Sequence, residues 1–183
     1  AFVGLVPGVI GAAAVTGRGD LTQPAVPLDP CTLPPPIRKL APMTAGIAAI
    51  TIDERRARAE RARRLMAEHR MDAILLEPGT SLSYFTGVEW WLSERPFLML
   101  IPAQGEPTCI CPAFEEARVR ELLHLSADVR VWEEDESPFE LVAGALRDRG
   151  LVTGRIGVEG QVRFFVLDGV RAAVARTDLL AAA

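Results

Sequence analysis

Short apolar runs that alternate with helical patterns are the feature of this sequence that most restricts its fold. Five runs of four or five residues are closed by Pro, Gly or charged residues: AILL at 73–76, FLMLI at 97–101, TCIC at 108–111, VRVW at 129–132 and RIGVE at 155–159. Runs of this length are typical of strands, because a helix usually needs about ten residues or more. Their alternation with helices predicts an α/β fold.

Helical patterns precede, separate and follow these runs, over 51–70, 113–125, 137–149 and 162–175. Thr51 and Glu54 have the spacing of a capping box at the start of the first helix. Ser137 is expected to cap the third helix in the same way, with Pro138 in the first helical position and Glu140 completing the box.

The connections between the runs define the expected sheet. The turn PAQGE at 102–106 predicts a β-hairpin, and this hairpin supplies an antiparallel pair in an otherwise parallel arrangement. We therefore expect a mixed β-sheet with helices on both faces. The segment SLSYFTG at 81–87 is interpreted as a turn that closes the first strand, and ARTDLLAAA at 175–183 has the pattern of a further strand.

Composition separates a leader from a folded part. Residues 1–50 hold eight of the fourteen prolines and only five charged residues, which is typical of an extended linker, so the folded domain is placed at 51–183. The net charge of −4 and the interspersed arginines do not favour nucleic-acid binding. The apolar run at 1–15 is short for a membrane span, which needs about 20 residues. Its length suits a signal-peptide core, so a periplasmic or otherwise exported protein is expected, with a disordered cytoplasmic leader as the alternative.

Motifs for catalysis or cofactor binding are missing from the sequence. It contains no GxGxxG after the first strand and no P-loop, HExxH or GxSxG. The potential soft-metal ligands lack the spacing of a zinc site; they are Cys31, Cys109, Cys111, His69 and His124. We therefore expect no catalytic residue, no metal site and no cofactor in this chain.

One stretch, SLSYFTGVEWWLSER at 81–95, gathers the only tyrosine and two of the three tryptophans beside an acid and a base. Trp offers a large apolar face, and Arg can pair a carboxylate through two hydrogen bonds. The candidate substrate or interface residues are Trp90, Trp91, Arg95 and Tyr84. In the alternative interpretation Tyr84, Phe85 and one tryptophan pack the corner after the first strand, and Arg95 pairs with a neighbouring acid.

Several motifs in order resemble one family over roughly residues 52–175. They are DERRARAERARRLMAEHRMDAILL at 53–76, Tyr84-Phe85-Thr86-Gly87, Glu94-Arg95-Pro96, FLMLIPAQGEPTCICP at 97–112, and an acid, Glu115 or Glu116, at the start of the next helix. This pattern resembles the creatinase/prolidase N-terminal domain, the non-catalytic half of Xaa-Pro peptidases and creatinases. The resemblance implies a ribonuclease H-like three-layer arrangement.

The resemblance also implies where the chemistry would lie. In the peptidases of this family a C-terminal "pita-bread" domain binds two divalent metal ions, and this chain ends before such a domain would begin. The chain alone is therefore expected to be inactive, with the C-terminal catalytic domain, a second copy in a homodimer and a proline-containing peptide as partners. In some members an aromatic loop residue of this domain reaches a neighbouring subunit's active site, and Trp90 and Trp91 match that loop, with Tyr84 and Arg95 beside them.

Two other functions stay open from the sequence. The chain can be a stand-alone protein-interaction module derived from such a domain, or an independent α/β enzyme whose site has no recognisable motif. A gene that continues into a segment rich in His, Asp and Glu favours the peptidase, whereas a stop codon favours the module.

Overall fold

The computed structural model describes residues 34–41, 43–44 and 46–182. The predicted signal-peptide core at 1–15 lies outside the described residues. Residues from Ala48 onward form one folded unit, and the described residues before Ala48 belong to a separate unit. Among those, Pro35–Arg38 form a short helix, α1, where the sequence predicts an extended linker. Proline is accepted in a first helical turn because the N–H that it lacks would have no helical partner there.

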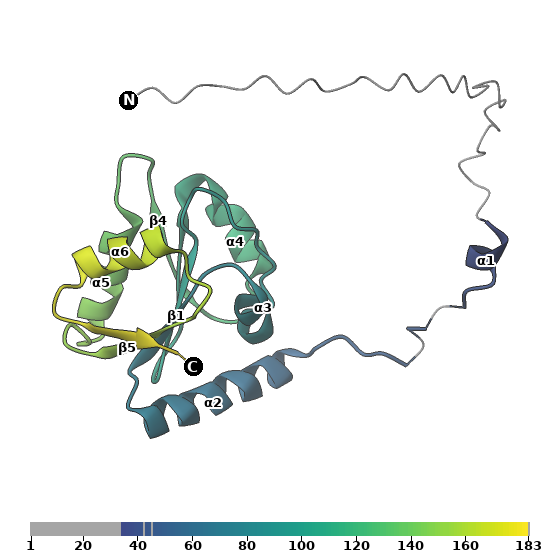
Figure 1. Ribbon diagram of the computed structural model, residues 1–183, viewed down its shortest axis with the longest axis horizontal. Helices are drawn as coiled ribbons and strands as arrows, with labels where there is room; N and C mark the ends of the chain where they lie inside the picture. Colours follow the sequence, from purple (N-terminus) through teal and green to yellow (C-terminus); the bar gives the residue numbers. More distant parts are fainter. Residues whose placement is uncertain (1–33, 42, 45, 183) are drawn as a thin grey trace, which may run out of the picture. The chain divides into compact units, whose positions relative to one another are not determined.

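A six-stranded sheet forms the centre of the folded unit in the described part of the chain (Figure 1). Its order is β4-β3-β2-β1-β5-β6. The strands are β1 (Ala73–Leu76), β2 (Leu98–Pro102), β3 (Thr108–Pro112), β4 (Asp128–Trp132), β5 (Arg155–Val158) and β6 (Asp178–Ala181). Strand β2 is antiparallel to both β1 and β3, and the other neighbours are parallel. The predicted mixed sheet is thus confirmed.

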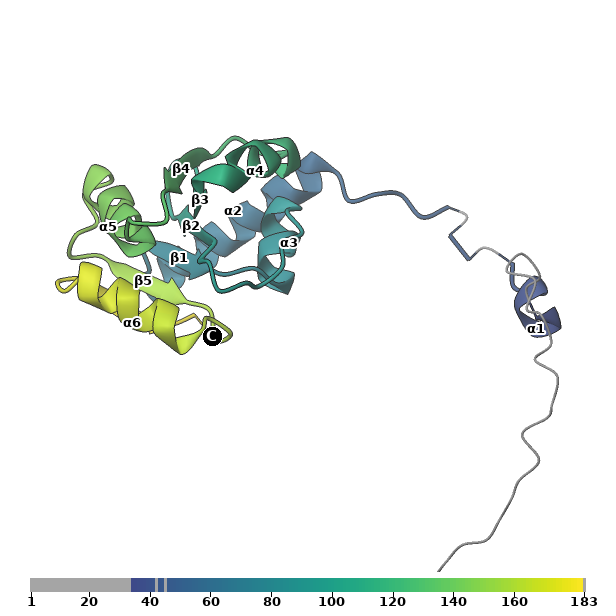
Figure 2. The same cartoon turned by 90° about the horizontal axis from the view of Figure 1, so that it is seen from above.

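Helices cover both faces of this sheet. They are α2 (Ile52–His69), α3 (Thr80–Thr86), α4 (Glu116–Leu122) after the 3₁₀ turn η1 (Ala113–Glu115), α5 (Pro138–Asp148) and α6 (Phe164–Ala173). Figures 1 and 2 show α5 and α6 on one side, and α2, α3 and α4 on the other. One buried cluster joins the sheet to Val142 of α5 and Val166 of α6, and a second joins it to Met66 of α2 and Val119 of α4. The predicted three layers are therefore present.

Burial on both faces explains why the strands have continuous apolar sequences. Every residue of β1, β2 and β3 is buried. Successive side chains of a strand point to opposite faces, so Leu75 enters the cluster beneath α5 and α6, while Ile74 and Leu76 enter the other.

The segment predicted as a turn after β1 is instead the helix α3. It ends at Gly87, whose φ of 81° lies in the left-handed region and whose N–H donates to the carbonyl of Ser83 at 2.9 Å. The Tyr-Phe-Thr-Gly motif is thus the end of a helix closed by a glycine. A Cβ on Gly87 would lie 2.8 Å from the guanidinium at the end of the Arg55 side chain, which would have to shift.

The two predicted capping boxes have different outcomes. The hydroxyl of Thr51 accepts a hydrogen bond from the N–H of Glu54 at 3.1 Å, which confirms the first cap. Ser137 stands at the start of α5 but makes no capping bond through its side chain. The N–H of Glu140 donates instead to the backbone carbonyl of Ser137 at 3.2 Å, so the donor that the hydroxyl would satisfy already has a partner.

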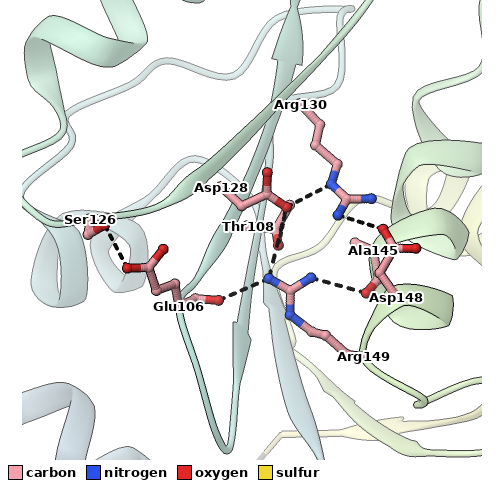
Figure 3. A network of polar contacts seen from close by, with 8 residues as sticks. All are labelled: Glu106, Thr108, Ser126, Asp128, Arg130, Ala145, Asp148 and Arg149. Atoms are coloured by element: carbon pink, nitrogen blue, oxygen red, sulfur yellow. Dashed lines mark hydrogen bonds and ion pairs between the residues drawn. The ribbon is translucent and has the colours of Figure 1, made fainter.

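Polar contacts connect α5 to the edge strand β4 (Figure 3). Arg130 donates to Asp128 at 2.8 Å and pairs with Asp148 of α5 at 2.8 Å. Arg149 donates to the carbonyl of Glu106 at 3.1 Å. Burial lowers the pKa of Arg130, but hydrogen bonds to both carboxylates outweigh it and raise the pKa above its ordinary value. These charges also make β4 a poor edge for pairing with another chain.

Candidate functional site

The loops that carry the candidate residues meet at one edge of the sheet. Strands β1, β3, β4 and β5 are parallel, so their carboxyl ends lie together, and the 88–97 loop enters the antiparallel β2 at the same edge. In open α/β sheets, ligands bind outside the carboxyl ends of the strands. We call this region, at the carboxyl ends of the parallel strands, the sheet-edge surface; its exposed aromatic residues include Trp91, Phe114, Phe164 and Phe165.

The two tryptophans of the 88–97 loop have opposite environments. Trp90 is half-buried and stacks on the buried Phe97, with ring centroids 4.9 Å apart and an interplanar angle of 25°. The guanidinium of Arg118 lies 5.5 Å from the centroid of the Trp90 ring. Trp91, in contrast, is 87% exposed. The loop therefore fixes one tryptophan in the fold and presents the other to solvent.

Two open hollows share Glu89 and both tryptophans. The first measures about 210 Å³ and is also lined by Ser93, Glu115 and Arg118. The second measures about 320 Å³ and extends to Gly79, Thr80 and Ser83. Small-molecule pockets usually measure about 300–1,000 Å³ and enclose most of the ligand. The first hollow is smaller than this and the second lies at the lower limit, and both are open to solvent, so neither encloses a ligand by itself.

Charged groups line the first hollow and its border. Burial raises the pKa of Glu115 above its ordinary value, although Arg95 and Arg118 oppose the shift. Arg95 pairs with Glu134 at 2.6 Å and also with Glu94. The hydrogen bond to Glu134 is the main reason that the pKa of Arg95 is raised. A substrate carboxylate would have to displace one of these acids to reach the Arg95 guanidinium.

Tyr84 lies with α2 and not with the tryptophans. Its ring is edge-on to Phe85, with centroids 5.0 Å apart, and the guanidinium of Arg58 lies 4.3 Å from the centroid of its ring. Arg58 also donates to the Tyr84 carbonyl at 3.1 Å. The structure thus brings Trp90, Trp91 and Arg95 into one loop and places Tyr84 at the contact between α2 and α3.

Sequence reasoning missed a buried ion pair at the same edge. Glu77, which follows β1 directly, is 2% exposed. Its carboxylate accepts hydrogen bonds from Nε and Nη2 of Arg163 at 3.0 and 2.7 Å, and from the backbone N–H of Arg163 at 2.7 Å. Arg163 also donates to the carbonyl of Ser93 in the 88–97 loop. The signal for this pair in the sequence was an acidic residue, Glu77, directly after a buried strand.

The described residues provide no metal site and no membrane span. Among them, no three His, Cys, Asp or Glu side chains gather closely enough to hold a metal ion. None of the described helices is both long and apolar enough to cross a membrane.

The two described cysteines are expected to resist thiol reagents in the folded protein. Cys109 and Cys111 are fully buried in the same cluster on β3. A hydrogen bond with Cys111, together with burial, raises the pKa of Cys109 well above its ordinary value. Because the thiolate is the reactive form, a Cys31→Ser variant should show no reaction with Ellman's reagent at pH 7 or pH 9, and reaction of both thiols in guanidinium chloride. Labelling of the folded variant within minutes would show that β3 opens.

Comparison with known proteins establishes the family. The family model of the Creatinase/Prolidase N-terminal domain matches residues 58–182, which is most of the folded unit. The chain belongs to this family. The family resemblance seen in the sequence is thus confirmed.

Two of the relatives are longer proteins, and a third is an N-terminal domain alone. An uncharacterized peptidase of Schizosaccharomyces pombe is 31% identical over 155 residues, which cover 77% of this chain and 33% of that protein. A dipeptidase of Pyrococcus horikoshii is 25% identical, with a TM-score of 0.59 over 68% of this chain and 34% of the other. The N-terminal domain of an X-Pro dipeptidase of Streptococcus pyogenes shares the fold, with 19% identity and a TM-score of 0.57 over 68% of this chain and 93% of its own. The chain thus spans about a third of the first two relatives.

Proposed function

We propose that this chain acts as the non-catalytic N-terminal domain of a metal-dependent Xaa-Pro peptidase of the aminopeptidase P or prolidase type. The family match supports this function, as do the relatives, which are a peptidase and dipeptidases. The chain corresponds to about a third of the full-length relatives. On this proposal the divalent metal pair and the hydrolytic reaction belong to a C-terminal domain.

Within such an enzyme, the sheet-edge surface would supply oligomer contacts and one rim of the substrate pocket. The observation that carries this assignment is the exposure of Trp91, 87% of its surface, beside hollows that one chain leaves open. Tryptophan is enriched among the residues that dominate binding energy at protein interfaces. A neighbouring subunit or a proline-containing peptide would close the hollows against both tryptophans.

The Trp91→Ala variant tests the interface. We expect the wild-type chain to form homodimers and the variant to dissociate about tenfold more readily, because a fully exposed ring contributes to association and not to the fold. Sedimentation velocity over a concentration series measures the dissociation constant, and thermal unfolding should give an unchanged Tm. Leu65→Ala, which shortens an exposed side chain on α2, is the matched control.

Equal association of wild type and Trp91→Ala would contradict the interface, as would an equal effect of Leu65→Ala.

The wild-type chain also tests whether the hydrolytic reaction belongs to another domain. Incubated with an Xaa-Pro dipeptide and Mn²⁺ or Zn²⁺, it is expected to release no amino acid. Release above the buffer blank would contradict the assignment of the reaction to another domain.

A further inference from the structure

We propose that Glu77 and Arg163 form a positioning pair that holds the 88–97 loop, and with it the exposed Trp91, in a fixed place on the sheet edge. The role of the loop toward a partner rests on the proposed function, whereas the positioning itself depends only on contacts within this chain.

Glu77 fixes the orientation of the Arg163 side chain. The Glu77 side chain is almost completely buried, and both of its oxygens accept hydrogen bonds from Arg163. Nε and Nη2 of the planar guanidinium both donate to Oε1, while the backbone N–H of Arg163 donates to Oε2, so the direction of the guanidinium is constrained as well as its distance. Arg163 is the N-cap residue of α6. A negative charge is favourable at the N-terminus of a helix, so the Glu77 carboxylate also stabilises the N-terminus of α6.

Arg163 in turn contacts the 88–97 loop. With Nε and Nη2 on Glu77, the guanidinium directs Nη1 to the carbonyl of Ser93. The ring of Phe165 lies 4.7 Å from the guanidinium carbon and provides a further contact. Arg163 is therefore the link between the end of β1 and the 88–97 loop.

The 88–97 loop has a second charged contact, which is more exposed than the contact with Arg163. Arg95 joins the loop to Glu134, but the Glu134 side chain is 62% exposed. Exposed pairs contribute little because water screens their charges, whereas the Glu77 carboxylate is buried and accepts three hydrogen bonds from Arg163. The Glu77–Arg163 pair is thus the stronger constraint. Trp91 lies between Trp90, which stacks on Phe97, and Ser93, which Arg163 holds, so these two anchors determine its place.

The Arg163→Lys variant tests the positioning. Lysine keeps the positive charge beside Glu77, but its ammonium lacks the planar fork that reaches a carboxylate and a separate carbonyl together. In hydrogen exchange we expect the amide of Arg95, which donates to the Ser93 hydroxyl at 3.1 Å, to exchange about tenfold faster, with the amides of β1 and β2 unchanged. Arg171→Lys, an exposed arginine on the same helix, is the matched control and should leave the loop unchanged.

Unchanged exchange of the Arg95 amide in a folded Arg163→Lys variant would overturn the inference. If that variant does not fold, Glu77→Gln, which has nearly the same shape, provides the same test because a neutral amide orients the guanidinium less strongly. Sedimentation then separates the two proposals. Faster loop exchange with unaltered association would support the positioning pair and contradict the proposed interface. Unchanged loop exchange would contradict the positioning pair, whether or not association changes.

Discussion

Glu77→Ala is expected to lower the free energy of unfolding by about 3 kcal/mol, the largest effect that we predict for a polar residue of this chain. Removing one partner of a buried pair leaves the other without compensation and typically costs about 3–5 kcal/mol. The Arg163 side chain is 26% exposed and can partly rehydrate, so the lower end of that range applies. Urea unfolding followed by circular dichroism measures the change.

Two further variants identify the cause of this loss. Glu68→Ala removes an exposed acid on α2 and should change the free energy of unfolding by about 0.5 kcal/mol or less. The double variant Glu77→Leu/Arg163→Met replaces the pair with apolar side chains, and it should regain much of the lost stability because no buried charge is left unpaired. A loss below about 1 kcal/mol for Glu77→Ala would show that water replaces the pair easily.

Trp90→Ala should lower the free energy of unfolding by about 2 kcal/mol, whereas Trp91→Ala should change it by less than about 0.5 kcal/mol. Truncating a fully buried aromatic residue costs about 3–5 kcal/mol, and the half-buried Trp90 loses part of that together with its stacking on Phe97. Thermal and urea unfolding of both variants measure the difference.

Trp90→Phe provides the control for ring stacking. It keeps an aromatic face against Phe97 and should recover more than half of the stability that alanine loses. Equal destabilisation by the two alanine variants would mean that both rings pack in solution, which would contradict the opposite environments of the two residues.

The architecture followed from the sequence because its strongest signals are local. Strands β1, β2 and β3 are buried on both faces, so each gives an apolar run that needs no knowledge of its neighbours. Helix α3 was missed because seven residues make only two turns, too few to show a helical period, and because its final Gly87 is equally typical of a turn.

The candidate site was only partly accessible to sequence reasoning. Adjacent aromatic residues in one loop identify Trp90 and Trp91 as a pair, but only the packing on Phe97 distinguishes the inner from the outer ring. The partners Glu77 and Arg163 are 86 residues apart in the chain. They meet because β1 and β5 are parallel neighbours in the sheet, and a single sequence carries no record of that pairing.

The place of β1 in the sheet has a consequence for folding order. Strand β1 pairs on one side with β2, which is close in the chain, and on the other with the distant β5. Closing a long loop costs more entropy than closing a short one, so the β2–β3 hairpin is expected to form early and the β1–β5 pairing late. Arg163 follows β5, so we expect the loop that bears Trp91 to be anchored only after β5 has paired with β1. A partner that recognises the anchored loop would thereby distinguish a completely folded chain from a partly folded one.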